Sequence, residues 1–459
     1  MKLRQWQSRC IDQAVLQLSP QSPHFFCQAT PAAGKTRMAA GLALALLKAG
    51  RIDLVICFAP SRQIVAGIQS TFADVLGRRL DGAIGAVGAT YTYQAMPFLD
   101  ASFWQLLDQY RVLAVFVEIH HCAGGDPVIS NRWGQEILQR VQDRATYTLA
   151  LSGTPWRSDE RCIALARYSD PHGTLVCDYS YGLEAAVRDG ACRSPRIVLL
   201  DNQQVRLELQ ESQARETKEF GSVGCLLRES PVTYEDLLHH EDIMVRLLNL
   251  ALKKLTEVRS HVADAGGLVV ATDVEHAHLI ASYLARMGED SMIVTYRSPD
   301  AQKRIEIFRH GKTKWIISVG MISEGTDIPR LQVCCYLSRI RTEMYFRQVL
   351  GRILRRRQDN DNHAWLYALA EPMIKRFAKR IADDLPSDLA VLSKVKEEKY
   401  KPEENPGQAN HEASHQLRYS SRLEGERHEK NGEASSSPSV VWMEVYFSQQ
   451  YRQQLLAVY

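Results

Sequence analysis

The stretch ATPAAGKT, which begins at Ala29 and ends at Thr36, has the residue types and spacing of a loop that binds phosphates. It follows an apolar run that predicts a strand and precedes a pattern that predicts a helix, as such a loop requires. Backbone N–H groups of the loop, through Ala33 and Gly34, can surround the phosphates of a nucleotide. Lys35 would reach the outer phosphates, and the Thr36 hydroxyl would bind Mg²⁺. The strict motif has glycine rather than alanine at its first position.

An acid and a pair of arginines further along the chain suit the same chemistry. Glu118 ends the apolar run LAVFVE, where a second acidic motif of a nucleotide hydrolase belongs. Arg352 and Arg355 lie three positions apart in QVLGRILR, so on a helix they share one face. Such a pair can reach across a cleft and balance the charge that develops on a γ-phosphate. Taken alone, arginines in GRILRRR would instead indicate a solvated basic helix.

The elements that must position these residues follow an α/β pattern. Apolar runs alternate with amphipathic stretches in the first third of the chain, and the alternation restarts after about Gly266. Strands that alternate with helices indicate a parallel sheet covered on both faces. We therefore expect two α/β domains of similar build, residues 1–230 and 231–390. The first would include a connector from about residue 158.

The C-terminal region has a different composition. Residues 391–439 are rich in Lys, Glu, Ser, Asn and Pro and contain few large apolar residues, which predicts a flexible linker. Residues 440–459 are abruptly apolar and aromatic. Either this segment folds back onto the body as a strand or helix, or it is a docking segment for a partner protein such as a nuclease.

Composition narrows the class of protein. The chain has 459 residues and a net charge of +3, so charge alone argues neither for nor against a nucleic-acid partner. Its 10 cysteines show no metal-ligand spacing, which favours reduced, buried thiols. The longest apolar run is too short to span a bilayer and the N-terminus has no apolar signal region. We expect a cytoplasmic protein with no membrane partner.

Taken in order, the motifs ATPAAGKT, VEIHH, LSGTPWR, SVGMISEGTDIP and QVLGRILR resemble those of superfamily-2 DEAD/DEAH-box helicases. The resemblance covers about residues 3–370 and is strongest to the branch of restriction-enzyme motor subunits and repair translocases. It implies two RecA-like parallel-sheet domains in tandem, with a flexible C-terminal extension. It also implies an enzyme that uses ATP and Mg²⁺ in the inter-domain cleft to move on nucleic acid. DNA is favoured over RNA because the motif variants are those of this branch.

The resemblance assigns roles at the nucleotide. Gln7, with Arg4, would contact the adenine base. Gly325 and Asp327 would approach the nucleotide from the second domain. Glu118 would take part in the metal site and would orient and deprotonate the attacking water.

The resemblance also assigns a nucleic-acid track and a coupling element. The residues predicted to contact nucleic acid are Ser61, Arg62, Thr92, Tyr93 and Gln94. The residues predicted to couple hydrolysis to domain movement are Ser152, Thr154 and Gln348.

One position departs from the family pattern. The residue before Glu118 is Val117, where the family has an aspartate that holds Mg²⁺ together with the loop hydroxyl. In one interpretation, phosphate oxygens, Thr36 and water hold the ion, and hydrolysis is slowed. In another, hydrolysis is essentially absent and the chain is an ATP-gated nucleic-acid clamp or regulatory subunit. A valine introduced to trap the protein is a third alternative.

Overall fold

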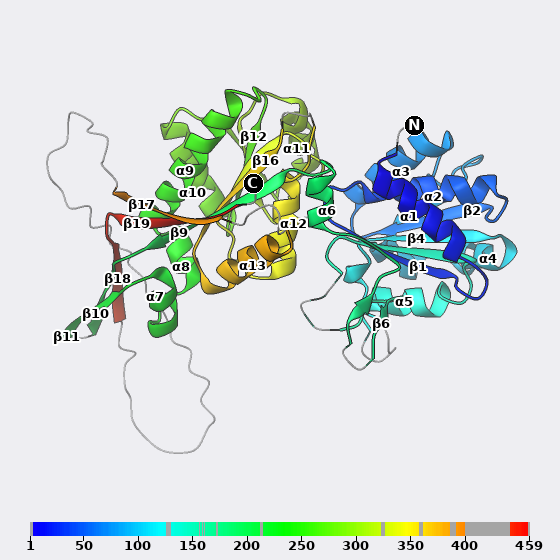
Figure 1. The fold of residues 1–459 in the computed structure, drawn as a ribbon, viewed down its shortest axis with the longest axis horizontal. Coiled ribbons are helices and arrows are strands. Elements are labelled where there is room, and N and C mark those ends of the chain that lie inside the picture. Colours follow the sequence, from blue (N-terminus) through cyan, green and yellow to red (C-terminus); the bar gives the residue numbers. More distant parts are fainter. Residues whose placement is uncertain are drawn as a thin grey trace, which may run out of the picture.

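The computed structural model describes residues 3–124, 130–155, 157, 159, 161–170, 173–211, 214–322, 326–357, 361–385, 392–399 and 441–457. Two α/β lobes lie next to each other along the long axis of the molecule (Figure 1). Helix α6 (Leu183–Arg188) lies where the lobes meet, and α12 (Glu343–Ile353) of the second lobe faces the first.

The first lobe is built on a six-stranded parallel sheet in the order β3-β2-β4-β5-β1-β8. Alternate residues of its strands face opposite sides, as a pleated strand requires. Cys57 packs with the helices on one face of the sheet, whereas Phe58 and Phe116 pack with those on the other. The strands are β1 (His24–Ala29), β2 (Leu54–Ala59), β3 (Gly88–Thr92), β4 (Val112–Val117), β5 (Tyr147–Ser152) and β8 (Tyr179–Tyr181).

Helices cover both faces of this sheet. One face is covered by α1 (Gln5–Gln17), α2 (Lys35–Lys48) and α3 (Arg62–Leu76). The other is covered by α4 (Ala101–Gln109) and α5 (Arg132–Arg140). Short 3₁₀ turns follow two strands: η1 (Tyr93–Phe98) after β3 and η2 (Ile119–His121) after β4. A small hairpin of β6 (Arg167–Tyr168) and β7 (Leu175–Val176) lies at the edge of the lobe.

The second lobe contains an eight-stranded sheet in the order β13-β14-β12-β15-β16-β9-β19-β17. The pairs from β13 to β9 are parallel, and the last two strands run antiparallel to their neighbours. The parallel strands are β9 (Ser194–Asn202), β12 (Gly266–Val270), β13 (Ser291–Thr295), β14 (Trp315–Val319), β15 (Leu331–Tyr336) and β16 (His363–Leu369). The helices are α7 (Val223–Glu229), α8 (Tyr234–His239), α9 (Glu241–Arg259), α10 (Val274–Arg286), α11 (Ala301–His310), α12 and α13 (Pro372–Asp383). The predicted pair of RecA-like α/β domains is confirmed.

Strand β9 corrects the predicted boundary between the domains. It pairs with β16 and therefore belongs to the second sheet, so the first domain does not extend to residue 230. The strands β10 (Val205–Glu211) and β11 (Ala214–Phe220) follow it and form a hairpin on the same lobe. The apolar pattern of β9 marks a buried strand, but it carries no information on which sheet accepts that strand.

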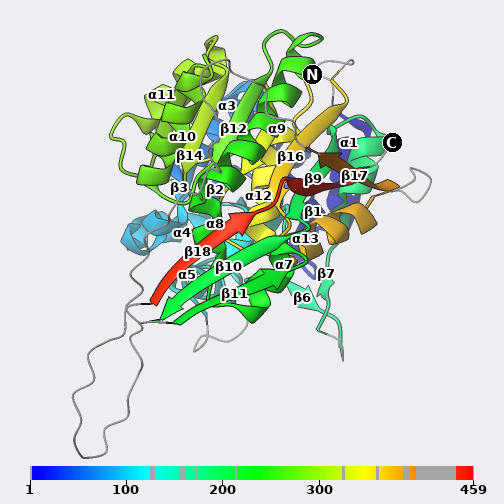
Figure 2. The same cartoon turned by 90° about the vertical axis from the view of Figure 1, so that its left-hand side faces the viewer.

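The C-terminal region also departs from the prediction of a linker. Residues 392–399 form β17, which pairs with β19 (Gln450–Ala457), so the linker prediction is wrong for these eight residues. Strand β18 (Val441–Phe447) pairs with β10 (Figure 2), and β19 pairs with β9 (Figure 1). Val445 and Tyr451 are buried. The described part of the C-terminal segment thus folds back onto the body, while residues 400–440 lie outside the described residues.

No helix in the described part of the chain combines the length and the apolar character needed to cross a bilayer.

Candidate nucleotide site between the lobes

A cavity of about 420 Å³ lies between the two lobes. Lys35, Thr36 and Glu118 line it from the first lobe. Arg352 and Arg355 line it from the second. Residues that are far apart in the sequence, and that were singled out for phosphate chemistry, therefore share one space.

The loop before α2 has the backbone conformation of a phosphate loop. Gly34 has φ of +96°, and a Cβ there would lie 2.9 Å from Gln7 Nε2, so this position requires glycine for two reasons. Ala32 also has a positive φ, +69°. Ala29, by contrast, is the last residue of β1 and is extended. Its methyl group fits there, which explains why the loop tolerates alanine at the first motif position.

The residues predicted to contact adenine make hydrogen bonds to main-chain carbonyls of the phosphate loop. The Arg4 guanidinium donates a hydrogen bond of 2.8 Å to the Ala33 carbonyl, and Gln7 Nε2 donates one of 2.9 Å to the Gly34 carbonyl. Gln7 Oε1 in turn accepts from the Arg4 backbone N–H at 2.9 Å. Gln7 is buried and Arg4 is exposed. A group that contacts Arg4 would therefore also affect the position of the phosphate loop.

Glu118 and Lys35 form an ion pair at the floor of the cavity. Lys35 Nζ lies 3.3 Å from Glu118 Oε1 and donates a hydrogen bond of 3.2 Å to the Ala29 carbonyl. The Gly153 N–H donates to Glu118 Oε2 at 3.3 Å. Glu118 itself has φ of +55°, a left-handed conformation that is uncommon for a residue with a Cβ. This turn directs the carboxylate away from the strand and toward Lys35.

Val117 ends β4 and lines the same cavity. Its side chain is 5% exposed and packs with the apolar core on the α2 side of the sheet. An aliphatic side chain thus occupies the position next to Glu118, and it offers no ligand to a cation.

The predicted coupling residues of the first lobe are linked to the same carboxylate through His120. The Ser152 hydroxyl lies 2.9 Å from His120 Nδ1 and accepts a hydrogen bond of 3.1 Å from the Thr154 N–H. His120 Nδ1 also lies 3.6 Å from Glu118 Oε2. Arg157 donates a hydrogen bond of 2.6 Å to the His120 carbonyl. The turn after β5 and the turn after β4 are therefore joined through buried polar groups.

The second lobe presents its arginines from α12 and the turn after it. Arg352 donates a hydrogen bond of 2.9 Å to the Thr326 carbonyl, and Arg355 forms an ion pair with Asp327. Burial lowers the pKa of Arg355 to about 10, so the side chain is still protonated near pH 7. Gln348 is buried on the same helix and also lines the cavity. The predicted residue Gly325 lies outside the described residues.

The lobes touch directly beside the phosphate loop. A Cβ at Gly351 would lie only 2.4 Å from the Pro31 Cβ, so glycine is needed where α12 meets the loop. Cys192 Sγ lies 3.6 Å from the Pro31 carbonyl oxygen. The chain that connects the two lobes thus runs along the same contact.

Arg193 in this connection is a residue that sequence reasoning missed. Its guanidinium group is 1% exposed and forms an ion pair with Asp361, with a hydrogen bond of 2.7 Å from Nε to Oδ1. It also donates to the carbonyl groups of Pro329, Leu331 and Ile353. These carbonyls flank the segments that carry the cavity arginines and Asp327. A single arginine at the start of an apolar strand was the only signal in the sequence.

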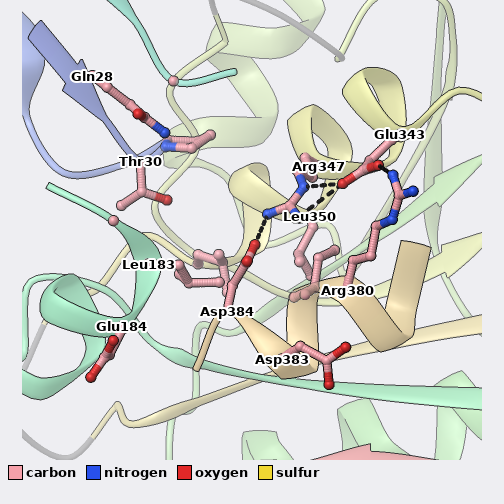
Figure 3. Close-up of a pocket in the computed structure, with 15 residues that line it drawn as sticks. Gln28, Thr30, Leu183, Glu184, Glu343, Arg347, Leu350, Arg380, Asp383 and Asp384 are labelled. Atoms are coloured by element: carbon pink, nitrogen blue, oxygen red, sulfur yellow. Dashed lines mark hydrogen bonds and ion pairs between the residues drawn. The ribbon is translucent and has the colours of Figure 1, made fainter. Parts of the chain in front are cut away.

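A second cavity, of about 710 Å³, is also lined by Pro31. Figure 3 shows the charged side chains around it. Arg347 of α12 spans it, with ion pairs of 2.9 Å to Glu343 and 2.6 Å to Asp384. Arg380 of α13 adds a contact of 2.5 Å to Glu343. These charges join α12 to the end of α13. The helix that carries Arg352 is therefore braced against its neighbour.

The residues predicted to contact nucleic acid gather at the carboxyl ends of β2 and β3. Ser61 caps α3, and its hydroxyl accepts a hydrogen bond of 3.3 Å from the Ile64 N–H. Arg62 and Gln94 are exposed, and Thr92 is half-buried. Tyr93 departs from the prediction: its side chain is 0% exposed and its hydroxyl group donates a hydrogen bond of 2.9 Å to the Val117 carbonyl. The prediction that this side chain contacts nucleic acid is wrong, because no part of it reaches the surface.

Comparisons with known proteins agree with this architecture. Residues 1–157 match the family model of the type III restriction enzyme res subunit. An uncharacterized protein of Mycobacterium tuberculosis is 30% identical to the chain over 394 residues, which are 83% of this chain and 63% of that protein. The chain thus spans less than two thirds of the length of this relative.

Two solved structures share the fold. A fragment assigned as the HsdR subunit of a type I restriction enzyme from Vibrio vulnificus aligns with a TM-score of 0.55 and 17% identity, over 81% of this chain and 65% of the fragment. The type ISP restriction-modification enzyme LlaBIII, bound to DNA, aligns with a TM-score of 0.50 and 12% identity, over 81% of this chain and 28% of that enzyme. The chain therefore resembles the superfamily-2 helicases, and among them the motor subunits of restriction enzymes.

Proposed function

We propose that the chain is an ATP-dependent DNA helicase or translocase that couples ATP hydrolysis between its lobes to movement on nucleic acid. The observation that carries this proposal is the cavity that Lys35 and Glu118 share with Arg352 and Arg355 of the other lobe. A nucleotide bound there would contact both lobes, so its hydrolysis would change the contact between them.

The residues of the cavity suit a nucleotide triphosphate. The start of α2 supplies backbone N–H groups and a positive helix end. Arg355 Nε is buried and has no hydrogen-bond acceptor in the described part of the chain, as expected for a group whose acceptor is a ligand. Thr36 would hold Mg²⁺, which would offset the phosphate charge when bound. Val117 does not fit a direct metal contact, so hydrolysis is expected to be slower than with an aspartate.

The ion pair between Lys35 and Glu118 indicates how binding and hydrolysis are linked. In the structure Lys35 Nζ is held by Glu118 at 3.3 Å and by the Ala29 carbonyl at 3.2 Å. Phosphate oxygens would compete for the same ammonium group, because they carry more charge than one carboxylate. Lys35 would then leave Glu118 free to accept a proton from the attacking water. Arg352 and Arg355 would balance the charge that develops on the γ-phosphate.

DNA is proposed as the partner because the family model and both aligned enzymes are of the restriction type, and one of these was solved with DNA. A second candidate function follows from Val117. With no oxygen at that position, the chain would act as an ATP-gated clamp that binds nucleic acid without unwinding it. A partner protein, such as a nuclease, is compatible with either function.

Phosphate release by the full chain distinguishes the two functions. Rates are measured without nucleic acid, with single-stranded DNA, with duplex DNA and with RNA. A motor requires a rate that DNA stimulates and that Arg352→Ala removes, while the matched variant Arg376→Ala, on the exposed side of α13, keeps it. ATP-dependent DNA binding without phosphate release would refute the motor and support the clamp function. Absence of both ATP and DNA binding would refute the two functions together.

A further inference from the structure

The Tyr93 side chain lies beneath the predicted nucleic-acid surface and reaches the strand that carries Glu118. Its hydroxyl group donates a hydrogen bond of 2.9 Å to the Val117 carbonyl oxygen. Its ring stacks on Trp133 of α5, with centroids 5.9 Å apart and planes inclined by 22°. The phenol is therefore held both along its flat face and at its tip.

The Val117 carbonyl belongs to the same planar peptide group as the Glu118 N–H. Because this group is rigid, a hydrogen bond that fixes the oxygen also fixes the nitrogen from which Glu118 extends. Glu118 itself adopts the left-handed conformation, with φ of +55° and ψ of +51°. The Tyr93 hydrogen bond therefore supports the conformation that directs the Glu118 carboxylate toward Lys35 and the Gly153 N–H.

The two neighbours of Tyr93 are less buried than Tyr93 itself. Gln94 is exposed, and its side-chain amide donates a hydrogen bond of 3.2 Å to the Pro60 carbonyl, which directly precedes Ser61. Thr92 ends β3 and is half-buried. Three consecutive residues thus connect the predicted nucleic-acid surface at the ends of β2 and β3 with the peptide group of Glu118.

From this arrangement we infer that Tyr93 is a positioning residue that couples the binding of nucleic acid to the orientation of Glu118. The inference rests on the proposed function, because it assumes that nucleic acid binds at Thr92 and Gln94. A strand bound there restrains the η1 turn, and the Tyr93 hydroxyl passes this restraint to the Val117 peptide. The hydrogen bond is made to the main chain, so it acts whether residue 117 is valine or aspartate. It explains why a tyrosine is completely buried in a segment that resembles a nucleic-acid motif.

The test compares Tyr93→Phe with the natural chain. The substitution keeps the ring and its contact with Trp133 but removes the hydroxyl group. ATP hydrolysis is measured with and without a thymidine oligonucleotide, together with the affinity for that oligonucleotide and the KM for ATP. We expect DNA-stimulated kcat to fall by about fivefold, the rate effect of one lost hydrogen bond. The KM for ATP and the affinity for DNA should change by less than about twofold, since Tyr93 contacts neither ligand.

Two matched variants separate this effect from general loss of packing. Tyr91→Phe removes a hydroxyl group from the adjacent strand β3, where the ring packs edge-on against Phe103. Cys122→Ala truncates a buried side chain of the apolar cluster in which Tyr93 packs. Both variants should retain DNA stimulation, because both keep the Tyr93 hydroxyl group that donates to the Val117 carbonyl.

The outcomes distinguish the inference from the function on which it rests. Full DNA stimulation in Tyr93→Phe would overturn the coupling role and leave the motor intact. Equal loss of stimulation in Tyr93→Phe and Cys122→Ala would also overturn it, since the Val117 contact would then not be the cause. If the natural chain hydrolyses ATP too slowly to measure, the same comparison is made in the Val117→Asp background. If DNA stimulates neither background, the proposed motor itself fails.

Discussion

Replacing Val117 by aspartate should have opposite effects on stability and on activity. Val117 is 5% exposed and packs in the core of the first lobe. An aspartate there loses apolar contacts and places a second carboxylate beside Glu118, whose own ion pair is with Lys35. A buried charged group without full compensation costs about 2–3 kcal/mol. Since 1 kcal/mol corresponds to about 2–4 °C for a domain of this size, Val117→Asp should lower the Tm by about 4–12 °C without metal.

This loss of stability should be largely offset when Mg²⁺ and ATP are present. The new oxygen would complete a metal site with Thr36, and a ligand at one hundred times its Kd returns about 2.7 kcal/mol to the folded state. The rate of hydrolysis should rise about tenfold, which requires only about 1.4 kcal/mol of additional transition-state stabilisation. Adding Glu118→Gln should remove that gain, because the water would lose its base.

Thermal unfolding and phosphate release, each with and without Mg²⁺, measure both halves of this prediction. Val117→Ile is the matched control, because it keeps the branching at Cβ and adds neither a charge nor an oxygen atom. Its rate should stay within about twofold of that of the natural chain. A natural chain whose rate equals that of Val117→Asp in saturating Mg²⁺ would refute the reasoning, since the valine would then not limit hydrolysis.

Four further outcomes are expected. Lys35→Ala should abolish ATP binding measured by calorimetry, whereas Lys48→Ala, exposed at the other end of α2, should not; unchanged affinity in the first variant would mean that the loop does not hold phosphate. Binding to a single strand should tolerate changes of sequence and weaken steeply as salt is raised in fluorescence anisotropy, because the predicted contacts are to the backbone, and a flat salt response would contradict this. Burial lowers the pKa of His276 to about 4, so the unfolded chain takes up a proton first as pH falls. The stability contributed by neutral His276 is complete above about pH 6.5 and is lost as pH falls toward 4. His276→Gln should therefore weaken the dependence of the urea midpoint on pH over this range. An unchanged dependence on pH would exclude His276 as its source. Deletion of residues 441–457 should lower the Tm of the second lobe and increase aggregation by exposing the edge of β9, so a deletion with unchanged Tm would show that β19 contributes little.

The local motifs predicted the fold class and the residues that the cavity brings together. This worked because a phosphate loop, an acid at a strand end and paired arginines on a helix each depend on spacing over a few residues. Parallel α/β topology then places such strand ends on one edge of each sheet. The approach of α12 to Pro31 was not predicted from the sequence, because it depends on how the two lobes pack.

Such local patterns could not predict which strands, far apart in the sequence, pair with each other. The charged segment LSKVKEEK suggested a solvated linker, yet it forms β17 at the edge of the second sheet, where charged residues are tolerated. Tyr93 was misplaced for a related reason, since a 3₁₀ turn rotates it inward while Gln94 stays outside. Arg193 had no motif at all, because its acceptors are three main-chain carbonyls from two distant segments and one carboxylate.

The insertion of β19 beside β9 has a consequence for synthesis of the chain. The first lobe has all of its strands once Tyr181 has left the ribosome, so it can fold early. Strand β9 emerges soon afterwards, but its parallel neighbour β16 and its antiparallel neighbour β19 are translated much later. Until then both edges of β9 remain open to other strands. Chaperones that shield such edges should therefore associate with the nascent chain after the first lobe has folded, and should be released only when translation has passed residue 457.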